Sequence, residues 1–504
     1  MMTIIREPIK KVGKDYIIYG MGNLFTKIAA LLLIPIYTKY LSVNEVGVIA
    51  VIEMIEQLML PFALAGLSNA LWRFLGKQDK IHPSQVISSG FWGSTIIGIL
   101  LFLVSIFFIP NIGRFLFLDP EEYWFLYPVL LNVLFITSIR YVMRVLQFQR
   151  RAFLFSLISV CQLAGILGLS IVLVSQYKWG LMGIIVAKSM VNGILFIPIL
   201  LFMIIKYLSS FSYSIFKQMA KYGYPLLPMT LALAFLNFSD RYFLNLFVPQ
   251  NEIGIYSIAY RIGMIIQMFL VLPLYMSFLP MVFKIGVDSK SNKEIISDMM
   301  FYYSALGCFL FLAVTLFSEN LILLIATDVY KTGLKFIPII LLAYFINGFR
   351  QFFMAVPALK DKTSQLGMIA LGVIGINIVS NWFFISTFGT IGAAISTILS
   401  FVLLTGAVYL LSQLEQKIHW KWSRILICCF FAGAIFLLAQ MLKLNCELNV
   451  YLINIAGLVL FPIVLRIFKV IGPKELNGVK HLFTSIQKNK IENLISDFKG
   501  NENG

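Results

Sequence analysis

The chain has 504 residues, of which 60% are hydrophobic and only 12% are charged. Soluble globular domains have about 45–50% apolar and about 25% charged residues, so this composition excludes a string of soluble domains. Apolar stretches close to the ~20 residues that cross a bilayer as a helix recur along the whole chain. They are too long for the ~10-residue strands of a membrane barrel. The sequence therefore predicts an all-α protein that spans the membrane many times.

Fourteen apolar stretches are predicted to be transmembrane helices. In chain order they cover 16–38, 46–66, 86–109, 123–143, 152–174, 180–205, 225–248, 254–278, 299–317, 335–358, 365–386, 391–412, 425–442 and 450–468. The first is longer than the apolar part of a typical signal peptide, contains Lys27 and precedes no small-residue cleavage site, so we expect it to be retained. After the last, apolar residues at roughly helical spacing predict a cytoplasmic amphipathic tail over 469–504.

The net charge of +17 first suggests a nucleic-acid partner, but the positions of the charges indicate otherwise. Of the 40 Lys and Arg residues, 29 fall in segments on the side of the N-terminus, 6 on the opposite side and 5 within spans. This positive-inside pattern predicts that both termini are cytoplasmic. No extramembrane segment is long enough for a soluble catalytic domain, and the cysteines lack metal-ligand spacing. We therefore expect no nucleic acid, catalytic residue, metal or cofactor.

The two halves of the chain repeat one another. YLSVNEVGVIAVIEMI at 40–55 aligns with FVPQNEIGIYSIAYRI at 247–262, at an offset of 207 residues. WGLMGIIVA at 179–187 aligns with FGTIGAAIS at 388–396, at an offset of 209 residues. Matches this far apart at nearly one offset indicate an internal duplication of six spans per unit. An even number of spans gives both units the same orientation, as in transporters with parallel repeats.

The duplication predicts a domain organisation of two lobes, 1–206 and 207–413, followed by two further helices in 414–468 and by the tail. The shared NE[VI]G element has a structural interpretation. Ser42 and Glu45 have the spacing of a capping box, and Glu252 lies near the positive end of its helix.

Eight ionisable residues fall inside the predicted spans, where burial is costly unless the side chain faces a polar interior. They are Lys27, Glu53, Glu56, Lys188, Asp240, Arg241, Arg261 and Arg350. Five cations against three anions leave an excess of two positive charges, divided between both lobes. Because Arg and Lys suit phosphate oxygens, this excess predicts a water-filled cleft that attracts an anion of about two charges.

The intramembrane charges are expected to have different roles. Candidates for contact with the substrate anion are Lys27, Arg261, Arg241, Arg350 and Lys188. Candidates for coupling to a cation or proton are Glu53, Glu56 and Asp240. A structural alternative stays open, in which Lys27 pairs with either glutamate and Asp240 pairs with Arg261. Successive helical residues do not face each other, so Asp240 beside Arg241 is expected to be a structural partner or ion ligand.

Three segments resemble the polysaccharide repeat-unit flippases of the Wzx type, whose superfamily also holds the multidrug MATE exporters and the lipid II flippases. They are GNLFTKIAALLLIPIYTKYLSVNEVGVIAVIE, SDRYFLNLFVPQNEIGIYSIAYRIG and the later FGTIGAAIST. The resemblance runs over nearly the whole chain and implies fourteen helices, arranged as two six-helix lobes plus two. Lipid II flippases carry functional cations on helices 1, 2 and 8. Lys27 and Arg261 match the first and eighth, whereas Glu53 and Glu56 depart from the second and favour a repeat-unit flippase.

The resemblance also implies a function. Such a flippase moves undecaprenyl-pyrophosphate-linked oligosaccharide from the cytoplasmic to the periplasmic leaflet of the bacterial inner membrane by alternating access, for O-antigen or capsule synthesis. Coupling to an H⁺ or Na⁺ gradient, and a polymerase and chain-length regulator as partners, would accompany it. Two alternatives stay open. A MATE-type exporter of organic cations should have an acidic cavity, and a membrane-embedded polymerase or glycosyltransferase should have a large loop domain or clustered carboxylates.

Overall fold

The computed structural model describes residues 32–75, 82–149, 151–360, 362–445, 449–468 and 470. The described residues form helices joined by short turns, without a strand in these ranges. They divide into two compact units. Unit 1 contains Met1–Ile296 and Ser318–Ile418, and unit 2 contains Ser297–Phe317 and His419–Gly504. The two sequence repeats lie in unit 1, except for Ser297–Phe317, which groups with the last two helices.

Twelve helices within the described ranges are long and apolar enough to cross a membrane. They correspond to the predicted spans other than the first and the seventh. The first span, 16–38, lies mostly outside the described residues. The seventh is divided at Ser239 into α11 (Leu227–Phe238) and α12 (Asp240–Phe247). The prediction of an all-α polytopic membrane protein is confirmed.

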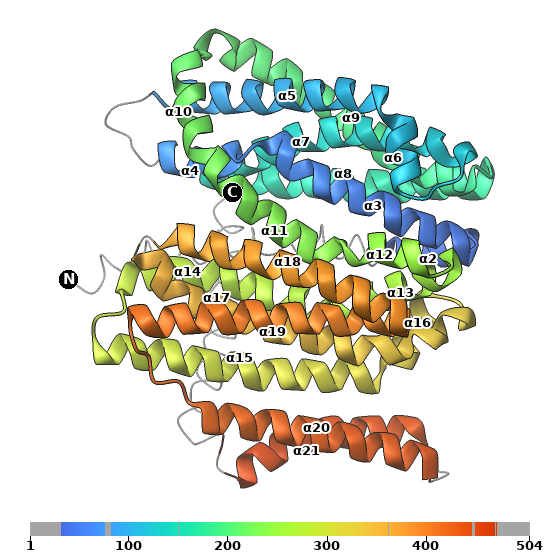
Figure 1. The fold of residues 1–504 in the computed structure, drawn as a ribbon, viewed down its shortest axis with the longest axis vertical. Helices are drawn as coiled ribbons and strands as arrows, with labels where there is room; N and C mark the ends of the chain where they lie inside the picture. Colours follow the sequence, from blue (N-terminus) through green and yellow to red (C-terminus); the bar gives the residue numbers. More distant parts are fainter. Residues whose placement is uncertain are drawn as a thin grey trace, which may run out of the picture. The chain divides into compact units, whose positions relative to one another are not determined.

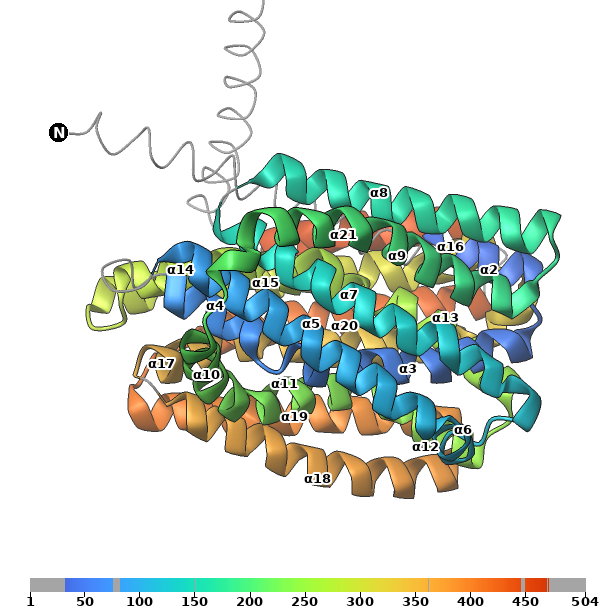
Figure 2. The same cartoon turned by 90° about the horizontal axis from the view of Figure 1, so that it is seen from above.

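The helices of the first repeat run roughly alongside one another (Figure 1), and the second view shows the same arrangement (Figure 2). Helix α7 contacts α3, α5 and α9, and α8 packs on α9. The bounds of these helices are Ile34–Tyr40 for α2, Val43–Leu64 for α3, Leu67–Leu75 for α4, Pro83–Phe107 for α5, Ile109–Phe115 for α6, Leu126–Phe148 for α7, Ala152–Ile171 for α8 and Gly180–Tyr207 for α9.

The second repeat follows α10 (Tyr213–Gly223), and its main contacts join α17, α18 and α19. Besides α11 and α12, its helices are Gln250–Gly263 for α13, Leu272–Ile285 for α14, Lys290–Leu316 for α15, Ser318–Ile325 for α16, Ile337–Leu359 for α17, Thr363–Phe388 for α18 and Thr390–Glu415 for α19. The two repeats meet chiefly where α3 packs along α13. This contact places the candidate site, because each of these two helices carries an intramembrane charge.

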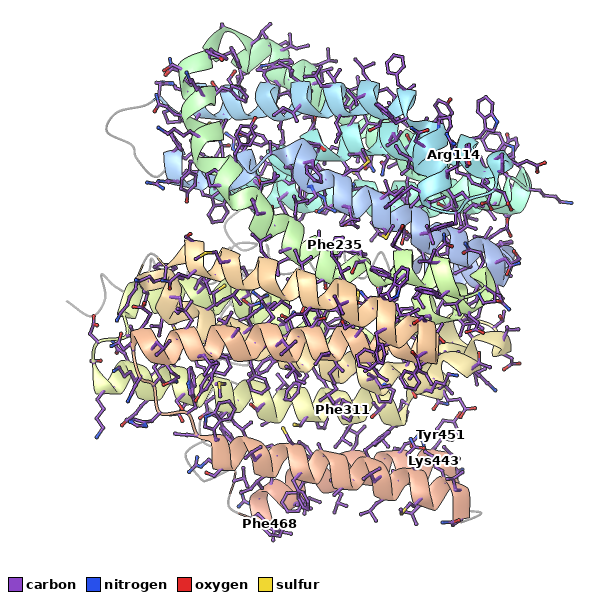
Figure 3. The ribbon with its side chains drawn as sticks, in the orientation of Figure 1. Arg114, Phe235, Phe311, Lys443, Tyr451 and Phe468 are labelled. Carbon is purple, nitrogen blue, oxygen red and sulfur yellow. The ribbon has the colours of Figure 1, made fainter. Side chains whose placement is uncertain are left out.

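Unit 2 is built on a hairpin of α20 (Trp422–Asn445) and α21 (Val450–Ile467). Lys443 and Tyr451 lie at one end of the hairpin and Phe468 at the other (Figure 3). The Lys443 ammonium donates a hydrogen bond to the Leu316 carbonyl of α15 at 3.3 Å. An amine near the end of an apolar helix thus satisfies a carbonyl at the end of its neighbour.

The repeated motifs contact one another in the same way within each repeat. The Glu45 carboxylate completes a capping box with Ser42 and also accepts a hydrogen bond from the Leu181 backbone N–H at 3.4 Å. Its counterpart Glu252 accepts a hydrogen bond from the Thr390 hydroxyl, also at 3.4 Å. In both repeats, therefore, a glutamate in the first turn of the second transmembrane helix accepts a hydrogen bond from the first turn of the sixth transmembrane helix. The predicted structural role of Glu45 and Glu252 is confirmed.

A second reciprocal contact joins the NE[VI]G elements of the two repeats. A Cβ atom added at Gly47 would lie 2.1 Å from the Gln250 carbonyl oxygen, and one at Gly254 would lie 2.2 Å from the Val43 carbonyl oxygen. The two glycines are 207 residues apart, and so are the two carbonyl residues, so a pseudo-two-fold relation exchanges the two contacts. Only glycine allows the backbones of α3 and α13 to approach this closely.

Replacing Glu45 by alanine should lower the melting temperature of the purified protein, and Glu252→Ala should lower it less. Glu45 accepts hydrogen bonds from the Ser42 backbone and side chain as well as from Leu181, and losing such a cap costs about 1 kcal/mol. Thermal unfolding in detergent measures the difference. The exposed Glu121, in the η1 segment (Pro120–Phe125), is the control, and Glu121→Ala should leave the melting temperature unchanged. Equal melting temperatures for all three variants would contradict the proposed helix-holding role.

Candidate functional site

Three predicted site residues converge on one carboxylate in the interior of unit 1. Glu53 on α3 binds Lys188 of α9 through one oxygen and Arg261 of α13 through the other, each at 2.5 Å. Lys188 belongs to the first repeat and Arg261 to the second, so Glu53 links the two repeats. The side chains are 15–24% exposed, so they are largely but not completely buried. The cluster carries a net charge of +1.

The cluster lies beside an aromatic ring and a small cavity with a mixed lining. The Arg261 guanidinium lies 5.4 Å from the centre of the Tyr37 ring, within the range of a cation–π contact. On the other side, Glu53 and Lys188 line a cavity of about 10 Å³ together with Glu56 and Asn132. This volume is at the lower limit for one water molecule. A pyrophosphate group therefore has no room here unless the helices around Glu53 move.

Glu56 lies one helical turn beyond Glu53 and is only 9% exposed. It faces the same cavity, beside Asn132 of α7. Within the described ranges, Glu56 forms no ion pair, whereas both oxygens of Glu53 are occupied. A buried carboxyl group without a paired cation is the kind of group that exchanges a proton. The predicted coupling role of the acids on α3 thus fits Glu56 better than Glu53.

Asp240 and Arg241 form a separate pair, contrary to the expectation that adjacent residues would not face each other. The Asp240 carboxylate accepts hydrogen bonds from Arg241 at 2.6 Å and from the Tyr256 hydroxyl at 2.9 Å. Asp240 begins α12, directly after Ser239, and its carboxylate also accepts a hydrogen bond from the Arg241 backbone N–H at 3.1 Å. Arg241 also stacks on Tyr260 at 3.9 Å. The alternative pair of Asp240 with Arg261 does not form, because Glu53 holds Arg261.

Arg350 on α17 is 8% exposed and forms no ion pair with a described carboxylate. Its guanidinium donates a hydrogen bond to the Asn347 side chain at 2.9 Å and approaches the sulfur of Met354 at 4.0 Å. Arg350 is therefore a buried cation whose described partners are neutral. Lys27 and the amphipathic tail 469–504 lie outside the described residues, so the predictions for them stay untested.

Sequence reasoning overlooked a chain of amides in the first repeat. The Gln162 amide donates to Asn192, and Asn192 donates to Asn132, each at 2.6 Å. These residues come from α8, α9 and α7, and the chain ends beside Glu56. The signal was present in the sequence, since each is an isolated amide within an apolar span. Neutral side chains did not enter the count of charges, although buried amides also require partners.

A corresponding polar cluster in the second repeat was also overlooked. Asn377 of α18 accepts hydrogen bonds from Ser239 at 2.9 Å and from Asn381 at 3.0 Å, and donates to Ser400 of α19 at 2.8 Å. Ser380 and Ser396 bond each other at 2.7 Å. The cluster joins α18 and α19 to the break between α11 and α12. It therefore fixes the position at which Asp240 and Arg241 enter the interior.

Comparison with solved structures defines the class to which this arrangement belongs. The fold resembles "Lipid II flippase MurJ, inward closed conformation" with a TM-score of 0.71 at 16% identity, covering 90% of this chain and 99% of that one. It also resembles an inward-facing multidrug resistance MATE family transporter of the MOP superfamily, with a TM-score of 0.62 at 15% identity over 78% of this chain and 97% of that one. An outward-facing MATE structure gives a TM-score of 0.57 at 15% identity, over 80% and 95% of the two chains. The molecule thus has the fold of the MOP-superfamily membrane transporters.

The sequence defines the family more closely. Residues 12–286 match the family described as "Polysaccharide biosynthesis protein". The chain belongs to this polysaccharide biosynthesis protein family, as the resemblance noted in its sequence implied. A comparison with curated protein sequences gives no match.

Proposed function

We propose that this protein is a flippase that moves undecaprenyl-pyrophosphate-linked oligosaccharide repeat units from the cytoplasmic to the periplasmic leaflet. The observation that carries the proposal is the inter-repeat cluster of Glu53, Lys188 and Arg261. Two cations share one carboxylate, and its oxygens occupy the positions that phosphate oxygens would take. A pyrophosphate that enters the cleft can displace Glu53 from Arg261, because a guanidinium binds carboxylate and phosphate in the same fork geometry.

The same exchange supplies a mechanism for alternating access. In the structure, Glu53 ties the first repeat to the second, and α3 packs along α13 through Gly47 and Gly254. An anion that binds Arg261 in place of Glu53 breaks the ion pair between the repeats. The repeats are then free to separate at the end where α3 and α13 begin. Ligand binding can shift such an equilibrium only by its differential affinity for the two states. Competition between phosphate and Glu53 supplies that difference.

Coupling to an ion gradient is proposed at Glu56, with Glu53 and Asp240 as the other candidate acids. Glu56 is buried in the cavity wall and unpaired within the described ranges, whereas Asp240 is held by Arg241 and Tyr256. Protonation of Glu56 would remove a negative charge beside Lys188 and so favour entry of an anion.

The membrane context follows from the charge distribution. The positive-inside pattern supports the proposal that both termini are in the cytoplasm of a bacterial cell, in which case α3 and α13 begin at the periplasmic side. We infer two pseudo-symmetric lobes, 1–206 and 207–413, and helices α20 and α21 as an addition. The lipid-linked glycan is the substrate, and a polysaccharide polymerase and chain-length regulator are the proposed partners on the periplasmic side.

The test is to delete the protein and determine in which leaflet the lipid-linked glycan accumulates. Accumulation in the inner leaflet supports flipping. Accumulation of single units in the outer leaflet would instead indicate a polymerase. An unchanged glycan together with lost drug resistance would indicate a MATE-type exporter, which shares the fold.

Replacing Lys188 by glutamine should reduce glycan export at an unchanged protein level, because one of the two cations beside Glu53 is lost. Surface polysaccharide is measured by immunoblotting, with the amount of membrane protein as reference. The control is Lys178→Gln, an exposed lysine in the turn before α9. Normal export by Lys188→Gln would show that Lys188 is only a structural partner of Glu53.

A further inference from the structure

Three side-chain amides in the interior of the first repeat, Gln162, Asn192 and Asn132, form what we call the amide chain. Gln162 of α8 donates a hydrogen bond to Asn192 of α9, and Asn192 donates one to Asn132 of α7, each at 2.6 Å. Asn132 and Asn192 are 3% and 1% exposed, and Gln162 is half-buried. Because α9 packs on both α7 and α8, the amide chain joins three helices of the repeat.

The amide chain ends at the buried acid Glu56. Asn132 and Glu56 line the same cavity of about 10 Å³, which is no larger than one water molecule needs, so their side chains are close together. The Glu56 carboxylate accepts a hydrogen bond from the Asn132 side chain there. Glu56 lies on α3, which packs on α7. Hydrogen bonds thus connect α8, through α9 and α7, to the interior face of α3.

The hydrogen bonds of the amide chain all point in one direction. A side-chain amide accepts through its oxygen and donates through its nitrogen. The Asn192 oxygen accepts from Gln162, so the Asn192 nitrogen is directed at Asn132. The Asn132 oxygen accepts from Asn192, so the Asn132 nitrogen is left to donate to Glu56. Each amide is therefore oriented by the one before it, and the last amide presents a donor to the carboxylate.

This direction suits the ionised form of Glu56. A carboxylate only accepts hydrogen bonds, and it accepts them more strongly than a neutral carboxyl group does. A side-chain amide does not itself titrate, so the amide chain is not a path for protons. Its effect is to fix the position of Glu56 and to favour the charge state in which this acid can take up a proton.

The charged and titratable neighbours of Glu56 come from several helices. Those that face α3 around Glu53 and Glu56 are Glu53 itself, Lys188 on α9, Arg140 on α7, Arg261 on α13, Arg241 on α12 and Tyr37 on α2. Helices α5 and α11 also pack on α3, but neither contains a titratable side chain. All these groups stay in place when an amide is replaced, so the replacement isolates the contribution of the hydrogen bonds.

We propose that Asn132 and Asn192 are positioning residues for proton uptake at Glu56, and that Gln162 orients Asn192 for this purpose. The amide chain keeps Glu56 ionised until a proton arrives, and so sets the pH at which the coupling acid is neutralised. The proton binds one carboxylate oxygen, which changes the charge of Glu56 from −1 to zero and breaks no covalent bond. The inference deepens the proposed function and rests on it for the role of Glu56 in coupling.

Infrared difference spectroscopy of the purified full-length protein follows the protonation of Glu56 directly. The carboxyl C=O band that appears as the pH is lowered is assigned to Glu56 by its loss in Glu56→Gln. We expect Asn132→Leu to move the midpoint of this band to higher pH by about one unit, a tenfold change in proton affinity, because the ionised form loses a charge-assisted donor. Asn192→Leu should move the midpoint less, and Gln162→Leu least, because both act only by orienting Asn132.

A merely structural role of the amides predicts a different pattern, in which the melting temperature falls and the midpoint stays where it is. Asn132→Gln keeps an amide donor and should recover part of the wild-type midpoint. The control is Asn454→Leu, since Asn454 is an equally buried amide on α21 in unit 2 and should leave the midpoint unchanged. If Asn132→Leu does not fold, Asn192→Leu and Gln162→Leu decide the question, because both keep Asn132. An unmoved midpoint in the leucine variants of the amide chain, or an equal shift in Asn454→Leu, would overturn the positioning role.

The failure of the amide chain and the failure of the proposed function have different signatures. If deletion of the protein leaves the glycan in its normal leaflet while the amide variants shift the Glu56 band, the flippase assignment fails and the positioning role stands. If deletion traps the glycan in the inner leaflet while every amide variant keeps the wild-type midpoint, the function stands and the positioning role fails. A wild-type protein in which no Glu56 band appears at any pH would overturn proton uptake at Glu56, and the inference with it.

Discussion

A protein carrying both Gly47→Ala and Gly254→Ala should stay in the membrane but export little or no glycan. Each added Cβ would lie 2.1–2.2 Å from a backbone carbonyl oxygen, whereas ordinary contacts begin at 3.4 Å. Helices α3 and α13 would have to move apart by about 1 Å, a shift that a packed interface resists. The state in which these helices touch is then lost, and a transport cycle cannot return to it. Surface polysaccharide and the melting temperature in detergent are the two measurements.

Matched glycines elsewhere in the chain provide the control for this variant. Gly372 on α18 and Gly406 on α19 have no atoms within 4 Å of an added Cβ. Gly372→Ala and Gly406→Ala should therefore export normally, and they add a better helix former at each position. If the Gly47 and Gly254 variant exports as well as these controls do, the reciprocal contact has no part in transport.

Replacing Glu53 by glutamine should both destabilise the protein and abolish export. The substitution removes two ion pairs at once and leaves Lys188 and Arg261 without a partner. Breaking a buried pair in this way costs up to about 3 kcal/mol, because the remaining charges are uncompensated. A lower melting temperature and lost surface polysaccharide are expected. Lys331→Gln removes ion pairs of an exposed lysine with Glu319 and Asp328, and should change neither measurement.

The double variant Glu53→Gln with Arg261→Gln separates charge pairing from substrate contact. Removing both partners should restore part of the lost stability, because one uncompensated charge disappears. Export should stay lost, since Arg261 is the proposed contact for the pyrophosphate. Recovery of both stability and export would show that Arg261 serves only to pair with Glu53, and the cationic cleft would have to be abandoned.

Much of the fold could be predicted from the sequence because bilayer spanning leaves few options for the backbone. An apolar run of sufficient length must form a helix, so twelve of the fourteen predicted spans appear as long helices. The seventh span was predicted as continuous but is broken at Ser239. The backbone of Ser239 keeps right-handed helical dihedral angles, and its side chain bonds Asn377 and Asn381 of α18, which are far away in the sequence.

The charged site was predicted only as a set of residues. The sequence singled out Glu53, Lys188 and Arg261 because ionisable side chains in apolar spans are costly. Their pairing could not be deduced, since Lys188 and Arg261 are 135 and 208 residues from Glu53 in the chain. Arg140 and Arg144 were counted with the cytoplasmic segment 140–151, although the predicted span 123–143 already contained Arg140. The structure continues this helix to Phe148, so both arginines lie within a long helix.

The sequence by itself determined the class of the protein, the duplication and the excess of positive charge within the spans. These properties depend on local composition and on periodicity along one chain, which are fully contained in the order of the residues. Only the tertiary structure decided which of the described charges form ion pairs with one another. It also revealed that the two NE[VI]G elements contact each other through Gly47 and Gly254. Such pairings depend on distances between helices far apart in sequence, and these are set by packing across the whole of unit 1.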